Sequence, residues 1–182
     1  MDITFRIVDK EKSESLRKEF IKTFVNTEAD KYHEYIEVMH SYNDGEFYNG
    51  YLWDFLRHND NYEKECSMQC AGEYLCGKNS VYIMWDLYSN QRVLDGSRFA
   101  VEYPKNIIIE MSGSRLTEVV IDKWNQGIQV PHWLPEDIYC FDESMSWYVI
   151  FTHEGHDHYT NPELNEDDYI RICFMQMEIP VE

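Results

Sequence analysis

The segment 153–158 reads His-Glu-Gly-His-Asp-His and gathers side chains that can bind a metal ion. Three imidazoles and two carboxylates in six residues could hold zinc, iron or manganese. The spacing fits neither His-Glu-x-x-His, because Asp157 stands four residues after His153, nor His-x-His-x-Asp-His. Gly155 after an apolar stretch indicates a strand exit and a solvated loop. We favour the solvated loop and therefore expect no cofactor. A metal-dependent hydrolase or nuclease that uses His153, His156 and His158 is kept as an alternative hypothesis.

A second segment, 72–79, nearly matches the phosphate-binding loop Gly-x-x-x-x-Gly-Lys-Ser/Thr. Asn79 stands where the magnesium-binding hydroxyl belongs. A strand rather than a helix is predicted to follow, so no helix N-terminus would face a phosphate. We interpret the segment as a helix C-cap, with Gly77 in the left-handed conformation.

The chain has five cysteines, Cys66, Cys70, Cys76, Cys140 and Cys173. Structural zinc sites use paired Cys-x-x-Cys knuckles, which the spacings here do not form. No signal peptide or long apolar span is apparent at the sequence level. We therefore expect reduced thiols in a cytoplasmic protein and predict that Cys66 and Cys70 lie in the core on one helix face.

Carboxylates are abundant and unevenly distributed. The 182 residues carry 34 Asp and Glu against 16 Lys and Arg, a net charge of −18. Residues 124–182 hold 12 acidic residues and one basic residue, Arg171. Such a surface argues against nucleic acid and anionic membrane as direct partners. Adjacent acids arise by chance in such a chain, so no general acid or base is assigned and no enzyme is predicted.

The N-terminal half is predicted to be mostly helical. Ile3, Phe5 and Ile7 alternate with polar or smaller residues and predict a strand with one buried face. Leu16, Phe20 and Phe24 then repeat every four residues, which is typical of an amphipathic helix. Further helices are predicted within 27–39, 48–55 and 64–75 from apolar residues at helical spacing.

The C-terminal half is predicted to be mostly strands, with one helix that opens at Gly113. The predicted strands span 81–88, 106–111, 138–141, 147–152 and 169–177. Helices first and strands last favour an α+β fold. We expect a mostly antiparallel sheet with the N-terminal helices packed on one face, in a single domain that spans residues 1–182.

The segment 134–154 carries a family resemblance. It reads Leu-Pro-Glu-Asp-Ile-Tyr-Cys-Phe-Asp-Glu-Ser-Met-Ser-Trp and continues as Tyr-Val-Ile-Phe-Thr-His-Glu. It resembles small bacterial proteins classed as a domain of unknown function, and 47–58 and 80–88 resemble earlier blocks of that family. The resemblance implies a fold and no established chemistry. The residues themselves predict a β-hairpin with its turn at Glu143 and Ser144, a core position for Trp147, and a bond from His153 to neighbouring backbone.

These observations favour an acidic inhibitor or immunity-type protein. It would bind and neutralise a basic protein that acts on nucleic acid, either as a toxin's immunity partner or as a phage-type anti-defence inhibitor such as an anti-CRISPR. A housekeeping interaction module is a further alternative. The predicted partner-binding residues are acidic and form two groups, one at 163–168 and one around the hairpin: Glu163, Glu166, Asp167 and Asp168; Glu136, Asp137, Asp142 and Glu143.

Overall fold

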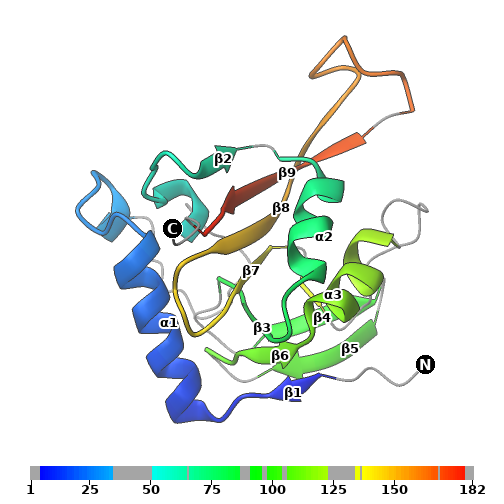
Figure 1. Ribbon diagram of the computed structural model, residues 1–182. Coiled ribbons are helices and arrows are strands. Elements are labelled where there is room, and N and C mark those ends of the chain that lie inside the picture. The colour runs from blue at the N-terminus through cyan, green and yellow to red at the C-terminus, as the bar shows by residue number, and fades with distance from the viewer. Residues whose placement is uncertain are drawn as a thin grey trace.

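The computed structural model describes most of the chain, and Figure 1 draws it as a ribbon. The described residues are 5–34, 51–64, 66–86, 91–95, 98–103, 106–122, 134–135, 137–167 and 169–178. The predicted helix within 27–39 falls partly outside these ranges. Among the helices of these ranges, none combines the length and the apolar character that a membrane crossing requires.

Helix α1 (Lys10–Phe24) forms where the apolar spacing predicts it. Asp9 caps its N-terminus, because the Asp9 carboxylate accepts a bond of 2.9 Å from the backbone N–H of Lys12. Leu16, Phe20 and Phe24 are buried along one side of the helix. The helix therefore adds a large apolar stripe to one face of the sheet.

The main sheet has seven strands in the described part of the chain, in the order β1-β6-β3-β7-β8-β9-β2. Each neighbouring pair is antiparallel. The predicted α+β class with a mostly antiparallel sheet is thus confirmed. The strands are β1 (Arg6–Ile7), β2 (Tyr62–Lys64), β3 (Val81–Met84), β6 (Ile109–Met111), β7 (Ile138–Phe141), β8 (Tyr148–Asp157) and β9 (Tyr169–Gln176). Strands β4 (Gln91–Asp95) and β5 (Arg98–Tyr103) form a separate pair.

Both faces of the sheet are buried, because successive residues of the central strands enter two different cores. In β7, Ile138 and Cys140 belong to one core, and Tyr139 and Phe141 belong to the other. This alternation is the period of a strand. It explains why the central strands are apolar at almost every position.

The helices are divided between the two faces. Helix α1 and the 3₁₀ turn η3 (Leu52–Phe55) cover the face with Tyr139. Helix α2 (Met68–Cys76), the short α3 (Gly113–Leu116) and the π-helical η4 (Thr117–Asp122) cover the other. Figure 1 shows α1 on one side of the sheet and α2 and α3 on the opposite side. We expected the N-terminal helices to pack on one face of the sheet. Helix α1 and η3 do share a face, but α2 packs on the other.

Glycine permits the close approach of α2 and α3. A Cβ on Gly113 would stand 1.7 Å from the carbonyl oxygen of Leu75 at the end of α2. The backbone N–H of Gly113 also donates to the Lys78 carbonyl at 2.9 Å. A larger residue at 113 would push the two helices apart.

Three local predictions differ from the structure. Ile7 is 55% exposed, because β1 is an edge strand and the predicted buried face lacks a covering layer there. Lys64 ends strand β2 rather than starting a helix, and α2 begins only at Met68. Residues 153–157 continue strand β8 instead of forming a loop, because they pair with β9 beyond an irregularity in register.

That continuation produces the arm, which we define as residues 155–170. It comprises the end of β8, the connecting turns and the start of β9. In Figure 1 the arm extends away from the sheet and helices as a long hairpin.

Candidate partner-binding surface

The arm presents three of the predicted partner-binding carboxylates to water. Glu163, Glu166 and Asp167 are all exposed in the turns between β8 and β9. Their carboxylates make neither an ion pair nor a hydrogen bond with any residue of the described ranges. Asp168, the fourth member of this predicted group, lies outside the described residues. The arm therefore carries negative charge that no described residue neutralises.

Asp157 shapes the start of the arm's turn rather than facing a partner. Its carboxylate accepts bonds of 3.0 Å from the backbone N–H groups of Tyr159 and Thr160. These backbone bonds, together with the Thr160 hydroxyl, hold the pKa of the Asp157 carboxyl below its usual value. The charge of Asp157 is thus used to fix the turn.

Apolar side chains accompany these charges on the arm. Tyr159 is 91% exposed, and Tyr169 and Ile170 are also exposed. The Tyr169 ring lies over Gly155, where a Cβ would approach ring carbon Cζ to 2.2 Å. Exposed tyrosine is enriched at protein interfaces because it offers a large rigid surface and a hydroxyl.

Exposed positive charge is absent from the described part of the C-terminal third. Arg171 is its one basic residue, and it is buried. The Arg171 guanidinium donates from Nε to the Thr152 carbonyl and lies 5.8 Å from the centre of the Phe151 ring. The basic residue of this third of the chain is therefore held inside the body rather than beside the arm's carboxylates.

The second predicted acidic group does not join the first. The turn 142–147 carries Asp142 and Glu143 and precedes β8, whereas the arm follows it, so these two carboxylates stand at the opposite end of the strand from the arm. Asp137 is separated from them and lies at the base of the arm, where it contacts His153. Glu143 pairs with Lys12 and accepts a bond of 2.8 Å from the Tyr82 hydroxyl, and these contacts lower its pKa. Asp142 accepts bonds from the Ser144 backbone at 2.9 Å and from Trp147 Nε1 at 2.7 Å. Glu136 lies outside the described residues.

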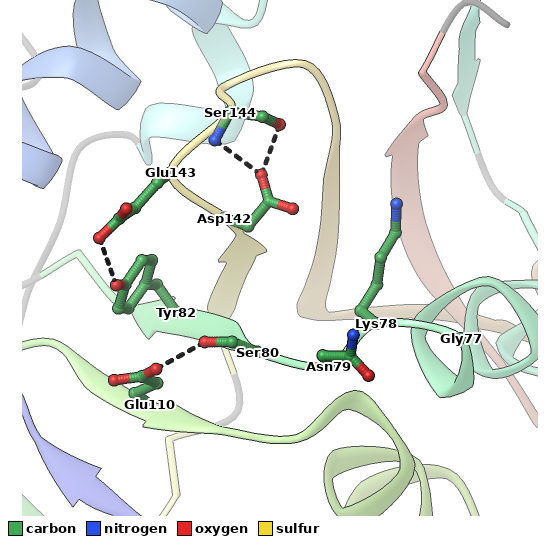
Figure 2. Close-up of a pocket in the computed structure, with 9 residues that line it drawn as sticks. All are labelled: Gly77, Lys78, Asn79, Ser80, Tyr82, Glu110, Asp142, Glu143 and Ser144. Atoms are coloured by element: carbon green, nitrogen blue, oxygen red, sulfur yellow. Dashed lines mark hydrogen bonds between the residues drawn. The ribbon is translucent and has the colours of Figure 1, made fainter.

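A cleft of about 570 Å³ opens beside this turn. Figure 2 shows the segment Gly77-Lys78-Asn79-Ser80 along one side of it, opposite the turn. The charged side chains that line it have partners. Glu110 accepts a bond from Ser80 and pairs with Arg6, and Lys78 pairs with Glu178. The cleft thus contains mainly neutralised polar groups.

The same segment tests the interpretation of the phosphate-loop likeness. Gly77 is the C-cap of α2, as predicted, and β3 follows. Its φ of −77° and ψ of −7° are right-handed, so the predicted left-handed conformation is wrong. The Lys78 N–H closes the helix with a bond of 2.9 Å to the Leu75 carbonyl, and this tight turn needs no left-handed residue.

The three histidines of 153–158 occupy different surroundings. His153 Nδ1 lies 3.0 Å from both carboxylate oxygens of Asp137. His158 Nδ1 lies 3.0 Å from the Leu164 carbonyl oxygen. Among the described residues, no group of three or more His, Cys, Asp or Glu side chains is arranged to hold a metal ion. The prediction that His153 bonds to neighbouring backbone is wrong, because Asp137 lies within reach across the β7–β8 pair.

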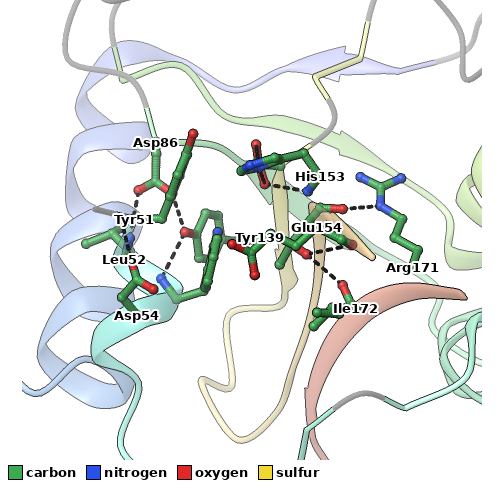
Figure 3. A network of polar contacts seen from close by, with 12 residues as sticks. Tyr51, Leu52, Asp54, Asp86, Tyr139, His153, Glu154, Arg171 and Ile172 are labelled. Carbon is green, nitrogen blue, oxygen red and sulfur yellow. Dashed lines mark hydrogen bonds and ion pairs between the residues drawn. The ribbon is translucent and has the colours of Figure 1, made fainter. Parts of the chain in front are cut away.

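Sequence reasoning missed a buried polar pair, Asp86 and Tyr139. Figure 3 shows the Tyr139 hydroxyl directed at the Asp86 carboxylate, to which it donates. Asp86 also accepts a bond of 3.3 Å from the backbone N–H of Leu52. Burial raises the pKa of Asp86 to about 7, although Arg17 and the Tyr139 bond act in the opposite direction. Burial likewise raises the pKa of Tyr139 well above its usual value.

A second missed cluster lies at the base of the arm. The Tyr51 ring stacks on Trp53 with 5.1 Å between ring centres and lies 5.2 Å from the ring centre of His153. Four carboxylates also interact electrostatically with Tyr51 and disfavour loss of its phenolic proton: those of Asp137, Asp86, Asp54 and Glu154. Burial, reinforced by these charges, raises the pKa of Tyr51 to about 12. Residues 51–53 and residue 153 are far apart in the sequence and share no motif, so the sequence carries no signal that could have revealed this cluster.

The cysteines divide between core and surface. Cys66, Cys140 and Cys173 are buried, whereas Cys70 and Cys76 are exposed. The prediction that Cys66 and Cys70 share a core helix face is therefore wrong, because Cys66 precedes α2 and Cys70 lies on its outer side. Burial raises the pKa of the Cys140 thiol, which makes it a poor nucleophile.

Comparison with family profiles, curated proteins and solved structures gives no match to this chain. The resemblance of 134–154 to the bacterial family of unknown function therefore stays a prediction. Functional reasoning rests on the residues themselves.

Proposed function

We propose that this protein is an acidic inhibitor of the immunity type, which binds a basic protein that acts on nucleic acid and blocks its nucleic-acid groove with the arm. One observation carries the proposal: the arm extends from the body and presents the carboxylates of Glu163, Glu166 and Asp167, which have no partner among the described residues, beside a tyrosine that is 91% exposed. An extended acidic hairpin has the shape and charge to occupy a groove that is built for phosphates.

The physical advantage of such an arm lies in association. Opposite charge fields can raise the association rate toward ~10⁸–10⁹ M⁻¹s⁻¹ at low salt. The net charge of −18 strengthens this field over the whole molecule. Tyr159 would then bury its ring against the partner, since aromatic anchors supply much of the affinity at interfaces.

The other acidic group supports the choice of the arm. Glu143 and Asp142 are engaged by Lys12, Tyr82 and Trp147, so a partner would have to break these contacts before using the charges. No such exchange is required at the arm. The proposal places the protein in the cytoplasm, where nucleic-acid-acting toxins and defence nucleases work.

The test measures association with a panel of purified basic nucleases from the native host and its phages. The variant Glu163→Gln, Glu166→Gln, Asp167→Asn removes three charges from the arm. We expect an unchanged or higher Tm, because mutual repulsion is removed, and an on-rate about tenfold slower with a flatter salt dependence. Inhibition of nuclease activity should weaken in parallel.

The matched control removes the same charge from α1 through Glu11→Gln, Glu14→Gln and Glu19→Gln, all exposed residues. It should retain the on-rate far better than the arm variant. Equal effects of the two variants, an unchanged salt slope in the arm variant, or binding without inhibition would each contradict the proposal.

A further inference from the structure

The cluster at the base of the arm combines planar rings with carboxylates. Its members are Tyr51, Asp54, Asp137, His153 and Glu154, which we call the basal site. Figure 3 shows Tyr51, Asp54, His153 and Glu154 in the neighbourhood of the Asp86–Tyr139 pair. Tyr51 is half-buried, whereas His153, Asp54 and Glu154 are exposed. A ligand can therefore reach the site from solvent.

The charges of the basal site are poorly compensated. Asp54 accepts one bond, 2.8 Å from the backbone N–H of Tyr51, and partial desolvation of its carboxyl group raises its pKa. The Glu154 carboxylate makes no hydrogen bond or ion pair with the described residues. Asp137 is the exception, since it holds His153 through Nδ1 and through a backbone N–H bond of 2.8 Å.

The rings give this negative region a flat wall. The planes of Tyr51 and Trp53 differ by only 9°, and His153 is tilted by 51° from Tyr51. Trp53 is itself fixed from behind by Phe174, at 5.6 Å between ring centres. This packing fixes the angle between the Tyr51 and His153 rings before any ligand binds. The carboxylates lie near the two rings.

We propose that the basal site binds the guanidinium group of an arginine side chain on the partner, stacked against Tyr51 and His153 and paired with Asp54 and Glu154. A guanidinium is planar and weakly hydrated, stacks on aromatic faces and pairs with carboxylates through two N–H groups. A lysine ammonium has no plane to stack. Arginine is also the common phosphate-binding residue of proteins that act on nucleic acid.

The inference deepens the proposed function, because the basal site adjoins the arm: His153 and Glu154 immediately precede Gly155 in β8. It rests on that function for the nature of the partner. The affinity of the site for a guanidinium can nevertheless be measured without any partner protein.

The experiment titrates the full chain with N-acetyl-arginine methylamide and follows backbone amide shifts by NMR. The probes for comparison are the citrulline analogue, which has the same shape without charge, and the lysine analogue. We expect weak saturable binding of the arginine compound, with shifts centred on Tyr51 and His153 and little response to the other two. Equal responses to all three compounds would overturn the proposal.

Variants locate the binding. Asp54→Asn with Glu154→Gln removes two charges and keeps acceptor atoms, and we expect about tenfold weaker arginine binding. Tyr51→Leu should also weaken it, whereas Tyr51→Phe should retain it, and dispersed amide spectra establish that each variant folds. Unchanged binding in the double variant would overturn the site.

The arm variant separates this inference from the proposed function. With the three arm charges neutralised, the arginine compound should still bind the basal site. Loss of nuclease association in the arm variant, together with no arginine binding in the native protein, would refute the basal site alone. Arginine binding with unaltered nuclease association in the arm variant would refute the proposed function alone.

Discussion

The turn 142–147 and the arm lie at opposite ends of β8, and both contain carboxylates beside an aromatic residue. In the turn, the body neutralises the charges and buries Trp147 completely. In the arm, the carboxylates at 163, 166 and 167 have no partner within the part of the chain that the structure describes, and Tyr159 is 91% exposed. The comparison shows that acidic residues of one composition differ after folding: those of the turn are engaged by the body, whereas those of the arm stay available to a partner of the kind we propose.

The largest expected effect concerns the aromatic residues at these two ends. Trp147 is fully buried, contacts Tyr74 and Lys78, and donates to Asp142. Trp147→Ala should lower the free energy of unfolding by about 4 kcal/mol, because it leaves a cavity and removes the donor from one oxygen of the Asp142 carboxylate. Tyr159→Ala should change it by less than about 0.5 kcal/mol. Chemical denaturation measures both, and a comparable loss in the two variants would remove the contrast between turn and arm.

A second effect contrasts a buried carboxylate with those of the arm. Burial raises the pKa of Asp86 to about 7 in the folded protein, above the value of about 3.9 for an unfolded chain. The folded state then holds this proton more tightly, so the contribution of Asp86 to stability falls as pH rises from about 4 to about 7. The total change is on the order of 4 kcal/mol, at ~1.4 kcal/mol for each of about three units of pKa difference.

Asp86→Asn tests this contrast, because the amide has nearly the shape of the carboxyl group, keeps one acceptor oxygen and cannot ionise. The variant should gain stability relative to the native protein as pH rises from about 4 to about 7. Glu163→Gln is the control, since an exposed arm residue should give a difference that hardly varies with pH. A constant stability difference between Asp86→Asn and the native protein would show that Asp86 is ionised throughout.

The smallest effect sharpens the boundary between arm and body. Gly155→Ala places a Cβ against the Tyr169 ring, which must move, and should cost about 1 kcal/mol. The double variant Gly155→Ala, Tyr169→Ala should recover most of this loss, because the obstructing ring is gone. Urea denaturation of the four proteins gives the coupling energy. Additive losses would show that Tyr169 does not lie over Gly155 in solution.

Much of the body could be read from local pattern. The apolar spacing predicts α1, because a helix buried along one stripe has apolar residues at a regular interval. The apolar runs predict β3, β7 and the central part of β8, because a strand buried on both faces is apolar at successive positions. The length of β8 was not predictable in this way. Residues 153–157 are polar, and only pairing with β9 makes them a strand.

The candidate sites show the same division. The sequence by itself determined the excess of acid in the last third and the scarcity of cations there, since both are properties of composition. Tertiary structure decided which acids remain available. Lys12 reaches Glu143 over 131 positions, and Asp137 meets His153 across the β7–β8 pair, so these pairings depend on strand register and helix docking. Burial of Arg171 likewise follows from its place in β9 and leaves the arm uniformly negative, because a buried guanidinium bonded to the Thr152 carbonyl cannot turn outward to neutralise it.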